Sequence, residues 1–279
     1  MGACLMRHAL TIFAALLLLV LPARAEVTVD LELVLAVDVS LSMDIEEQEL
    51  QRQGFIAAFR DASVHKAIAS GAHGKIAVTY VEWADAATQQ VVVPWMVVDG
   101  PATARGFADR LAAAPISRAR MTSISGAIRY SMQILAANRI KGVRRVIDIS
   151  GDGPNNAGAP VARARDEAVA AGIVINGLPI LLKPYSRSGF FEVASLDTYY
   201  YDCVIGGTGS FVIPVRERAE FAPAIRRKLI LEISSREPRV IPAQFIQGKP
   251  GPPARRGTTD CMIGERLWQK YMDGRYNDP

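Results

Sequence analysis

The sequence predicts an α/β fold: a doubly wound, mostly parallel β-sheet with helices on both faces and one antiparallel edge strand. Short apolar runs alternate with segments of helical periodicity, which is typical of parallel strands joined by crossover helices. The first run, LELVLAV at 31–37, is almost continuously apolar, as expected of a strand covered on both faces. Half of the 279 residues are hydrophobic, which is enough for a substantial core.

The first strand is followed by a predicted helix over 44–59. Asp44 and Glu47 have the spacing of a capping box, in which the two side chains accept hydrogen bonds from backbone N–H groups at the start of a helix. Phe55 begins a series of apolar residues that recur at helical spacing. This segment therefore has both a start signal and a face to bury.

The next two strands are expected to form a hairpin at the edge of the sheet. They cover 75–84 and 88–98, and a short polar connection separates them. Pro94 lacks a backbone N–H group, so it favours an edge position in the second of these strands. This hairpin would supply the antiparallel strand of the sheet.

The remaining elements continue the alternation of strand and helix. The predicted strands are 144–150, 172–180 and 211–215, and the predicted helices are 103–114, 123–138, 161–171, 218–234 and 262–272.

Polar side chains follow two of the predicted strands and begin one of the predicted helices. Asp38, Ser40 and Ser42 come directly after the first strand, Thr122 precedes the helix at 123, and Asp152 follows the strand at 144–150. Ligands of open α/β sheets bind beyond the carboxyl ends of the strands, so we expect these side chains to meet there. Carboxylate and hydroxyl oxygens suit Mg²⁺, Mn²⁺ or Ca²⁺ better than zinc, and Mg²⁺ fits best.

The charge of this candidate metal set has a consequence for binding. Two carboxylates balance the charge of a divalent ion without exceeding it, and neutral hydroxyls fill further positions. The ion would therefore remain attractive to a carboxylate of a partner, since Mg²⁺ usually keeps exchangeable waters.

The order of these motifs resembles the von Willebrand factor type A domain and its metal-ion-dependent adhesion site. The likeness covers about 30–235, and within that family the chain is most similar to the bacterial exported group DUF1194. The resemblance implies that Asp38, Ser40, Ser42, Thr122 and Asp152 hold a divalent cation. It implies a binding module for a protein ligand that offers a carboxylate, and no enzymatic activity.

The resemblance also has a departure and an implied movement. Ser150 and Gly151 stand where the family often has a threonine just before Asp-Gly, and Asp148 is an alternative to Asp152 that strand alternation would leave within the sheet. In the family the last helix can shift when the site is occupied, and 218–234 is the analogous element.

Three other interpretations of the motif remain. Asp38, Ser40 and Ser42 would cap the next helix in a purely structural role, although Asp44 already offers a cap. A Mg²⁺-dependent phosphohydrolase would use Asp38 as a nucleophile, but Ser40 stands where phosphatases of the haloacid dehalogenase type place a second Asp as general acid. A structural domain with a vestigial metal site is the third interpretation.

The amino terminus predicts export. Arg7 and His8 precede a short apolar stretch, and Ala-Arg-Ala follows it at 23–25, which is the pattern of a signal peptide over 1–25. An uncleaved membrane anchor is the alternative. The mature chain would then form a domain at 26–235 and a tail rich in proline and glycine at 236–279. We expect a periplasmic or secreted protein without a membrane span after cleavage.

Cysteine content and charge narrow the class of protein further. Cleavage would leave Cys203 and Cys261, which are expected to form a disulfide in an oxidising compartment, with two buried thiols as the alternative. The net charge of +4 falls to +2 when Arg7 and Arg24 are removed. This mild charge, without a basic stripe, argues against nucleic acid as a partner.

Overall fold

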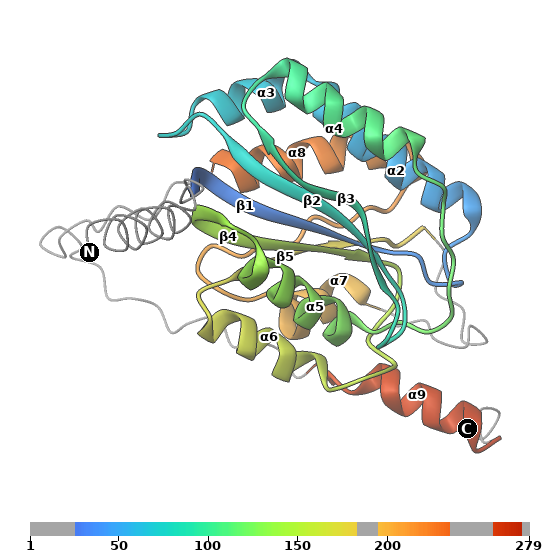
Figure 1. Cartoon of the computed structure of the whole chain (residues 1–279). Coiled ribbons are helices and arrows are strands. Elements are labelled where there is room, and N and C mark those ends of the chain that lie inside the picture. Colours follow the sequence, from blue (N-terminus) through green and yellow to red (C-terminus); the bar gives the residue numbers. More distant parts are fainter. Residues whose placement is uncertain (1–25, 183–194, 235–258, 275–279) are drawn as a thin grey trace, which may run out of the picture.

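The computed structural model describes residues 26–182, 195–234 and 259–274, and it confirms the predicted fold class (Figure 1). The sheet has five strands in the order β3-β2-β1-β4-β5, and all neighbours are parallel except β2 and β3. The strands are β1 (Val27–Asp38), β2 (Ile76–Trp83), β3 (Gln89–Val98), β4 (Ile140–Gly151) and β5 (Val174–Pro179). The helices are α2 (Ile45–Arg60), α3 (Ala62–Ala69), α4 (Pro101–Ala113), α5 (Ile124–Ala137), α6 (Val161–Ala170), α7 (Leu196–Tyr199), α8 (Phe221–Ser234) and α9 (Ile263–Met272).

The strand order places a switch point between β1 and β4. The chain builds β2 and β3 on one side of β1 and then crosses to add β4 and β5 on the other. In sheets of this kind the crevice beyond the carboxyl ends at the switch point receives ligands. Asp38 ends β1 and Gly151 ends β4, so both predicted strand ends lie at this crevice.

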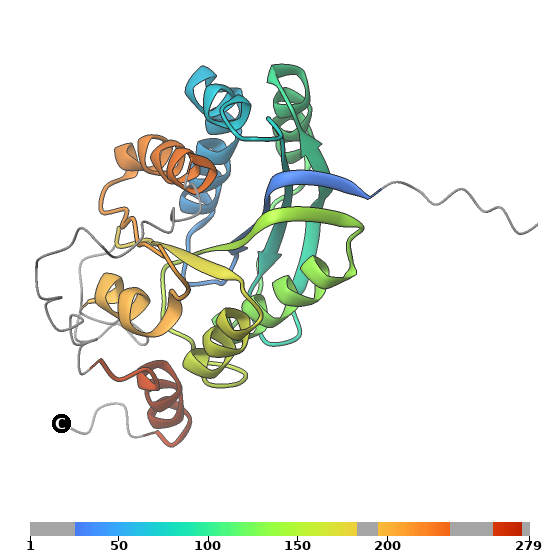
Figure 2. The same ribbon diagram turned by 90° about the vertical axis from the view of Figure 1, so that its left-hand side faces the viewer.

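Helices cover both faces of the sheet (Figures 1 and 2). Alternate residues of β1 supply the two cores: Leu33 and Leu35 pack with α2, α3, α4 and α8, whereas Val34 and Ala36 pack with α5, α6 and α7. Side chains of a strand alternate between faces, so a continuous apolar run buries both. The apolar run at 31–37 thus accounts for the central position of β1.

β4, β5 and α8 share a buried charged cluster. Asp148 on β4 lies 2.9 Å from Nζ of Lys228 on α8, and Lys228 also pairs with Glu232 at 2.5 Å. Asn176 on β5 donates to Glu232 at 3.0 Å. Asp148 therefore lies within the sheet and faces α8, as strand alternation predicted.

Several elements differ from the sequence predictions. The helix α3 and the helical turns of α7 and η1 (Tyr200–Val204) were not predicted. The predicted strand at 211–215 forms only isolated bridges, from Val212 to Gly177 and from Val215 to Ile180. The N–H groups of Ile213 and Val215 donate to the carbonyls of Gly177 and Pro179, but Pro179 of β5 has no N–H group to donate in return, which interrupts the ladder between the two bridges.

The carboxyl-terminal segment is attached to the body of the protein. Cys203 in η1 and Cys261 just before α9 form a disulfide with an S–S distance of 2.01 Å, so the expected bridge is confirmed. The predicted helix at 262–272 is present as α9. The predicted signal peptide at 1–25 lies outside the described residues. Within the ranges that the structure describes, no helix is long and apolar enough to cross a membrane.

Candidate metal centre

Three loops meet at the carboxyl edge of β1 and β4: loop A (39–44), loop B (114–123) and loop C (152–160). Loop B pairs with loop A, because the Ala119 N–H group donates to the Val39 carbonyl at 3.1 Å. Arg118 adds a hydrogen bond from Nη2 to the Met43 carbonyl at 2.8 Å. These two hydrogen bonds thus hold loops A and B side by side.

Short hydrogen bonds connect four of the five predicted ligands. Asp38 Oδ1 accepts from the Ser40 N–H group at 2.7 Å, and Ser40 Oγ lies 2.7 Å from Ser42 Oγ. Ser42 Oγ donates to Asp152 Oδ1 at 2.6 Å. Two carboxylates and two hydroxyls from the end of β1, loop A and loop C therefore form one continuous cluster, although Asp152 is 110 residues from Ser42.

Thr122, the fifth predicted ligand, is fixed beside loop C. Its N–H group donates to Asn156 Oδ1 at 2.8 Å, and its carbonyl accepts from the Asn156 N–H group at 2.8 Å. Its Oγ1 lies 3.9 Å from the position that a Cβ atom on Gly153 would take. Met121 before it has φ of 69°, a left-handed conformation that is rare for a residue with a side chain and is found at functional sites.

Asp38 has an electrostatic environment that favours a cation. Its side chain is completely buried, and Oδ2 has no hydrogen-bond partner among the described residues. Burial and the negative charge of Asp152 raise the pKa of Asp38 well above its ordinary value. A buried, incompletely bonded carboxyl group next to a second carboxylate is costly without a positive charge. The donor set and this environment fit a hard divalent cation.

Gly151 explains the departure from the family pattern just before Asp152. A Cβ atom there would lie 2.8 Å from Asp38 Oδ2 and 2.9 Å from the Tyr200 hydroxyl, which is closer than packed atoms allow. The preceding Ser150 is buried and accepts a hydrogen bond from Gln51 Nε2 of α2 at 2.7 Å. Gly151 therefore permits the close approach of Asp38 and Tyr200 to the end of β4.

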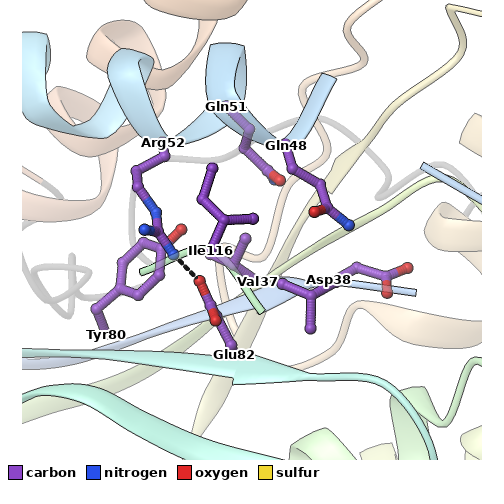
Figure 3. A pocket seen from close by; sticks show the side chains of 9 residues that line it. Val37, Asp38, Gln48, Gln51, Arg52, Tyr80, Glu82 and Ile116 are labelled. Atoms are coloured by element: carbon purple, nitrogen blue, oxygen red, sulfur yellow. Dashed lines mark hydrogen bonds and ion pairs between the residues drawn. The ribbon is translucent and has the colours of Figure 1, made fainter. Parts of the chain in front are cut away.

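A small pocket lies between Asp38 and α2 (Figure 3). Arg52 of α2 pairs with Glu82 of β2 inside it, and both side chains are buried. Gln48 and Gln51 extend from α2 toward the strand ends (Figure 3), and Gln48 Nε2 donates to the Ser40 carbonyl at 3.4 Å. The polar side chains of Gln48, Gln51 and Arg52 thus connect α2 to loop A and to the strand ends, on the face of the sheet opposite α5.

Several residues that shape the site were not predicted from the sequence. Asn155 and Asn156 lie in a segment whose only evident signal was its turn chemistry, and both are buried. Tyr199 and Tyr200 belong to a run of three tyrosines at 199–201, a pattern that by itself indicates packing rather than a ligand site. The Tyr200 hydroxyl is buried without a hydrogen-bond partner in the described part of the chain, and burial and the charges of Asp38 and Asp152 raise its pKa well above the ordinary value.

Solved structures with this fold are numerous but distant in sequence. The mussel byssus proximal thread matrix protein 1, solved with a zinc-occupied MIDAS motif, matches with a TM-score of 0.54 and 13% identity over 75% of this chain and 49% of its own. The pilus adhesin SpaC from Lactobacillus rhamnosus GG matches with a TM-score of 0.52 and 12% identity over 74% of this chain and 31% of its own. This chain thus spans about half of the mussel protein. No curated protein sequence matches it significantly.

A von Willebrand factor type A domain from Catenulispora acidiphila matches with a TM-score of 0.49 and 15% identity, over 74% of this chain and 43% of its own. A family model matches residues 28–237, which is most of the chain. The chain therefore shares the fold of the mussel and pilus structures and belongs to the family described as "Protein of unknown function (DUF1194)".

Proposed function

We propose that this protein is an exported binding module that uses a divalent cation to engage a carboxylate on a protein partner. Asp38, Ser40, Ser42, Thr122 and Asp152 would hold the cation. The observation that carries the proposal is the buried Asp38 carboxyl group, which has an unpartnered oxygen and lies at one end of the hydrogen-bonded cluster that leads to Asp152.

The donor set supports Mg²⁺ as the resident ion, with Mn²⁺ or Ca²⁺ as substitutes. All five donors are oxygens, and only two of them belong to carboxylates, so the chain leaves room for waters and for one external acid. When bound, the cation supplies the attraction for that acid. The Ser40 and Ser42 hydroxyls keep the protein's own negative charge low, and the Asp38 carboxyl group stays shielded from solvent.

Apolar side chains beside the cluster support a protein as the partner. Leu41 is 47% exposed and Ile45 is 51% exposed, and both flank Ser42 on loop A and the start of α2. Arg118 and Arg120 of loop B are also exposed. Apolar contacts and positive charge around a site for an acid favour an acidic residue with an apolar neighbour, rather than a free carboxylate ion.

Export is part of the proposal. The disulfide between Cys203 and Cys261 is of a kind that persists in oxidising compartments. The charged and apolar pattern at 1–25 supplies the expected signal peptide. We place the mature protein in the periplasm or outside the cell.

Selection from a peptide display library tests the proposed function. The mature chain is immobilised with Mg²⁺, and bound peptides are released with a chelator. We expect the released peptides to share an Asp or Glu, and replacement of that residue by Asn or Gln should abolish binding. The Asp38→Ala variant should select nothing, whereas Asp99→Ala, an exposed acid at the opposite edge of the sheet, should behave as the parent.

Two results would contradict the proposal. One is a set of binders that need neither the cation nor an acidic residue. The other is phosphatase turnover of a model phosphomonoester that depends on Asp38, which would favour a phosphohydrolase.

A further inference from the structure

The loop that carries Asp152 is held by residues beyond the region that the family model matches. Loop C continues from Asp152 to Asn155, which is completely buried. Asn155 Oδ1 accepts from the Ser125 N–H group at 2.9 Å, and its Nδ2 donates to the Ala159 carbonyl at 3.1 Å. These two bonds orient loop C against the start of α5. The second Nδ2 hydrogen and the backbone N–H group of Asn155 donate to other elements.

Helix α9 supplies the next contact. Asn155 Nδ2 also donates to Glu265 Oε1 of α9 at 2.7 Å. Gly264, the residue before, is buried against the backbone of Asn155: a Cβ atom there would overlap the Asn155 carbonyl oxygen and lie 2.8 Å from its carbonyl carbon. The first turn of α9 thus rests directly on loop C, and only a residue without a side chain fits.

The aromatic segment before η1 supplies the remaining contact. The Asn155 N–H group donates to the Tyr199 hydroxyl at 3.1 Å. Tyr199 ends α7 and is followed by η1, which contains Cys203. Because Cys203 is bonded to Cys261, the two elements that support Asn155, namely α9 and the α7–η1 segment, are covalently joined. Thr259 also contacts Asp202 between these two supports.

We propose that the carboxyl-terminal helix α9 is a positioning element of the metal centre, which acts through Gly264 and Glu265 on Asn155 and so on Asp152 and Thr122. Loop C transmits this effect because Asn156, the next residue, makes two hydrogen bonds with Thr122. This inference rests on the proposed metal-binding function. It assigns to the segment after 237 a role in affinity for the cation, beyond its contribution to stability.

Substitutions in the first turn of α9 test the inference. Gly264→Ala should move α9 away from Asn155 and weaken Mn²⁺ binding roughly tenfold or more, the size of effect that supporting residues of metal ligands have. Glu265→Ala should weaken binding less, and Glu265→Gln should restore it because its amide oxygen still accepts from Asn155. Gln269→Ala, exposed on the same helix, is the matched control and should leave binding unchanged.

Two measurements on the full mature chain separate this inference from the proposed function. Calorimetric titration with Mn²⁺ gives the affinity of each variant, and hydrogen exchange of the Asn155 and Asn156 amides in chelator reports the loop without metal. We expect faster exchange of both amides in Gly264→Ala than in Gln269→Ala.

The outcomes are distinct. If the parent binds Mn²⁺ and Gly264→Ala binds it equally well, the inference is overturned and the proposed function stands. If the parent binds no Mn²⁺, the proposed function fails and the role in affinity fails with it. Equal exchange of the two amides in parent and Gly264→Ala would also overturn the inference.

Discussion

The side chain of Asp38 shows how a single residue can be costly for the fold and useful for binding. It is completely buried, it faces the charge of Asp152, and one of its oxygens is unpartnered in the described part of the chain. Proteins retain such unfavourable groups at functional sites, where a ligand offsets the cost.

Asp38→Asn is therefore expected to separate stability from metal binding. In chelator the variant should be more stable than the parent by about 1–2 kcal/mol, because it removes a buried carboxylate that faces Asp152. The parent should gain about 2.7 kcal/mol from Mn²⁺ at a hundred times its Kd, and the variant should gain nothing. Urea unfolding with Mn²⁺ or chelator measures both effects. A variant that is less stable in chelator and still responds to Mn²⁺ would contradict the account.

Gly151 offers a second test at the same scale. Gly151→Ala should lower the free energy of unfolding by about 1–3 kcal/mol, because its Cβ atom overlaps Asp38 Oδ2 and the Tyr200 hydroxyl. Tyr200→Phe removes one of the two clashing atoms, so the double variant should lose less stability than the sum of the single variants. Urea unfolding of all four proteins gives this coupling, and strict additivity would show that Tyr200 does not limit the space beside Gly151.

The individual ligands were predictable because each follows a strand or precedes a helix within a short motif. Asp38, Ser40 and Ser42 come directly after an apolar run, and the structure brings Asp152 to them. The supporting residues were not predictable, because Asn155 and Tyr199 interact across the fold and neither belongs to a recognisable pattern.

Among the elements, α8 is connected to the sheet by charge as well as by apolar contacts. Its Lys228 is buried between Asp148 of β4 and Glu232, and its Nζ lies 5.1 Å from the centre of the Phe211 ring. Burial, with the charge of Glu232, raises the pKa of Asp148 to about 7, although Lys228 acts in the opposite direction. The cluster thus binds a proton that the unfolded chain releases.

This proton predicts a pH dependence of stability. Between about pH 4 and pH 7 the folded protein keeps the proton on Asp148 and the unfolded chain does not. The stability contribution therefore falls as the pH rises, by up to about 1.4 kcal/mol per pH unit. Asp148→Asn lacks this contribution, so its stability relative to the parent should increase from pH 5 to pH 8. Urea unfolding at both values measures the difference, and a difference independent of pH would refute it.

Elements with strong periodicity were predicted well, and short or irregular ones were not. The buried strands and the helices α2, α5 and α8 have patterns that burial on one or two faces dictates. The helix α3 is short, and α7 with η1 is stabilised by tertiary contacts such as the disulfide rather than by its own sequence. Propensity alone cannot identify such elements.

At the scale of the whole molecule, the disulfide determines how the carboxyl-terminal segment stays attached. It joins residues 58 positions apart, and one of them precedes α9. In the chain-entropy model, a cross-link over a loop of this length lowers the entropy of the unfolded chain and so raises its free energy by about 4 kcal/mol.

Loss of the disulfide should therefore destabilise the protein by about 2–4 kcal/mol. The Cys203→Ala/Cys261→Ala double variant, compared with the parent by urea unfolding, measures this loss. The parent in a dithiol reductant should lose a similar amount, while the double variant should be insensitive to the reductant. An unfolding midpoint that is the same in all conditions would show that the bridge does not stabilise the fold.

The architecture as a whole followed from the alternation of strands and helices, and the order of the motifs indicated the edge where a site would lie. The contact between α9 and loop C was not predictable, because it joins segments about 110 residues apart that share no sequence signal, and the pair of cysteines links α9 to η1 rather than to loop C.

The central claim is that oxygens from the end of β1 and from three loops hold one divalent cation. The most direct measurement is anomalous diffraction from a crystal of the mature protein soaked in Mn²⁺. The account predicts one strong anomalous peak surrounded by Asp38, Ser40, Ser42, Thr122 and Asp152. A well-ordered site without a peak, or a peak whose ligands lie elsewhere, would contradict it.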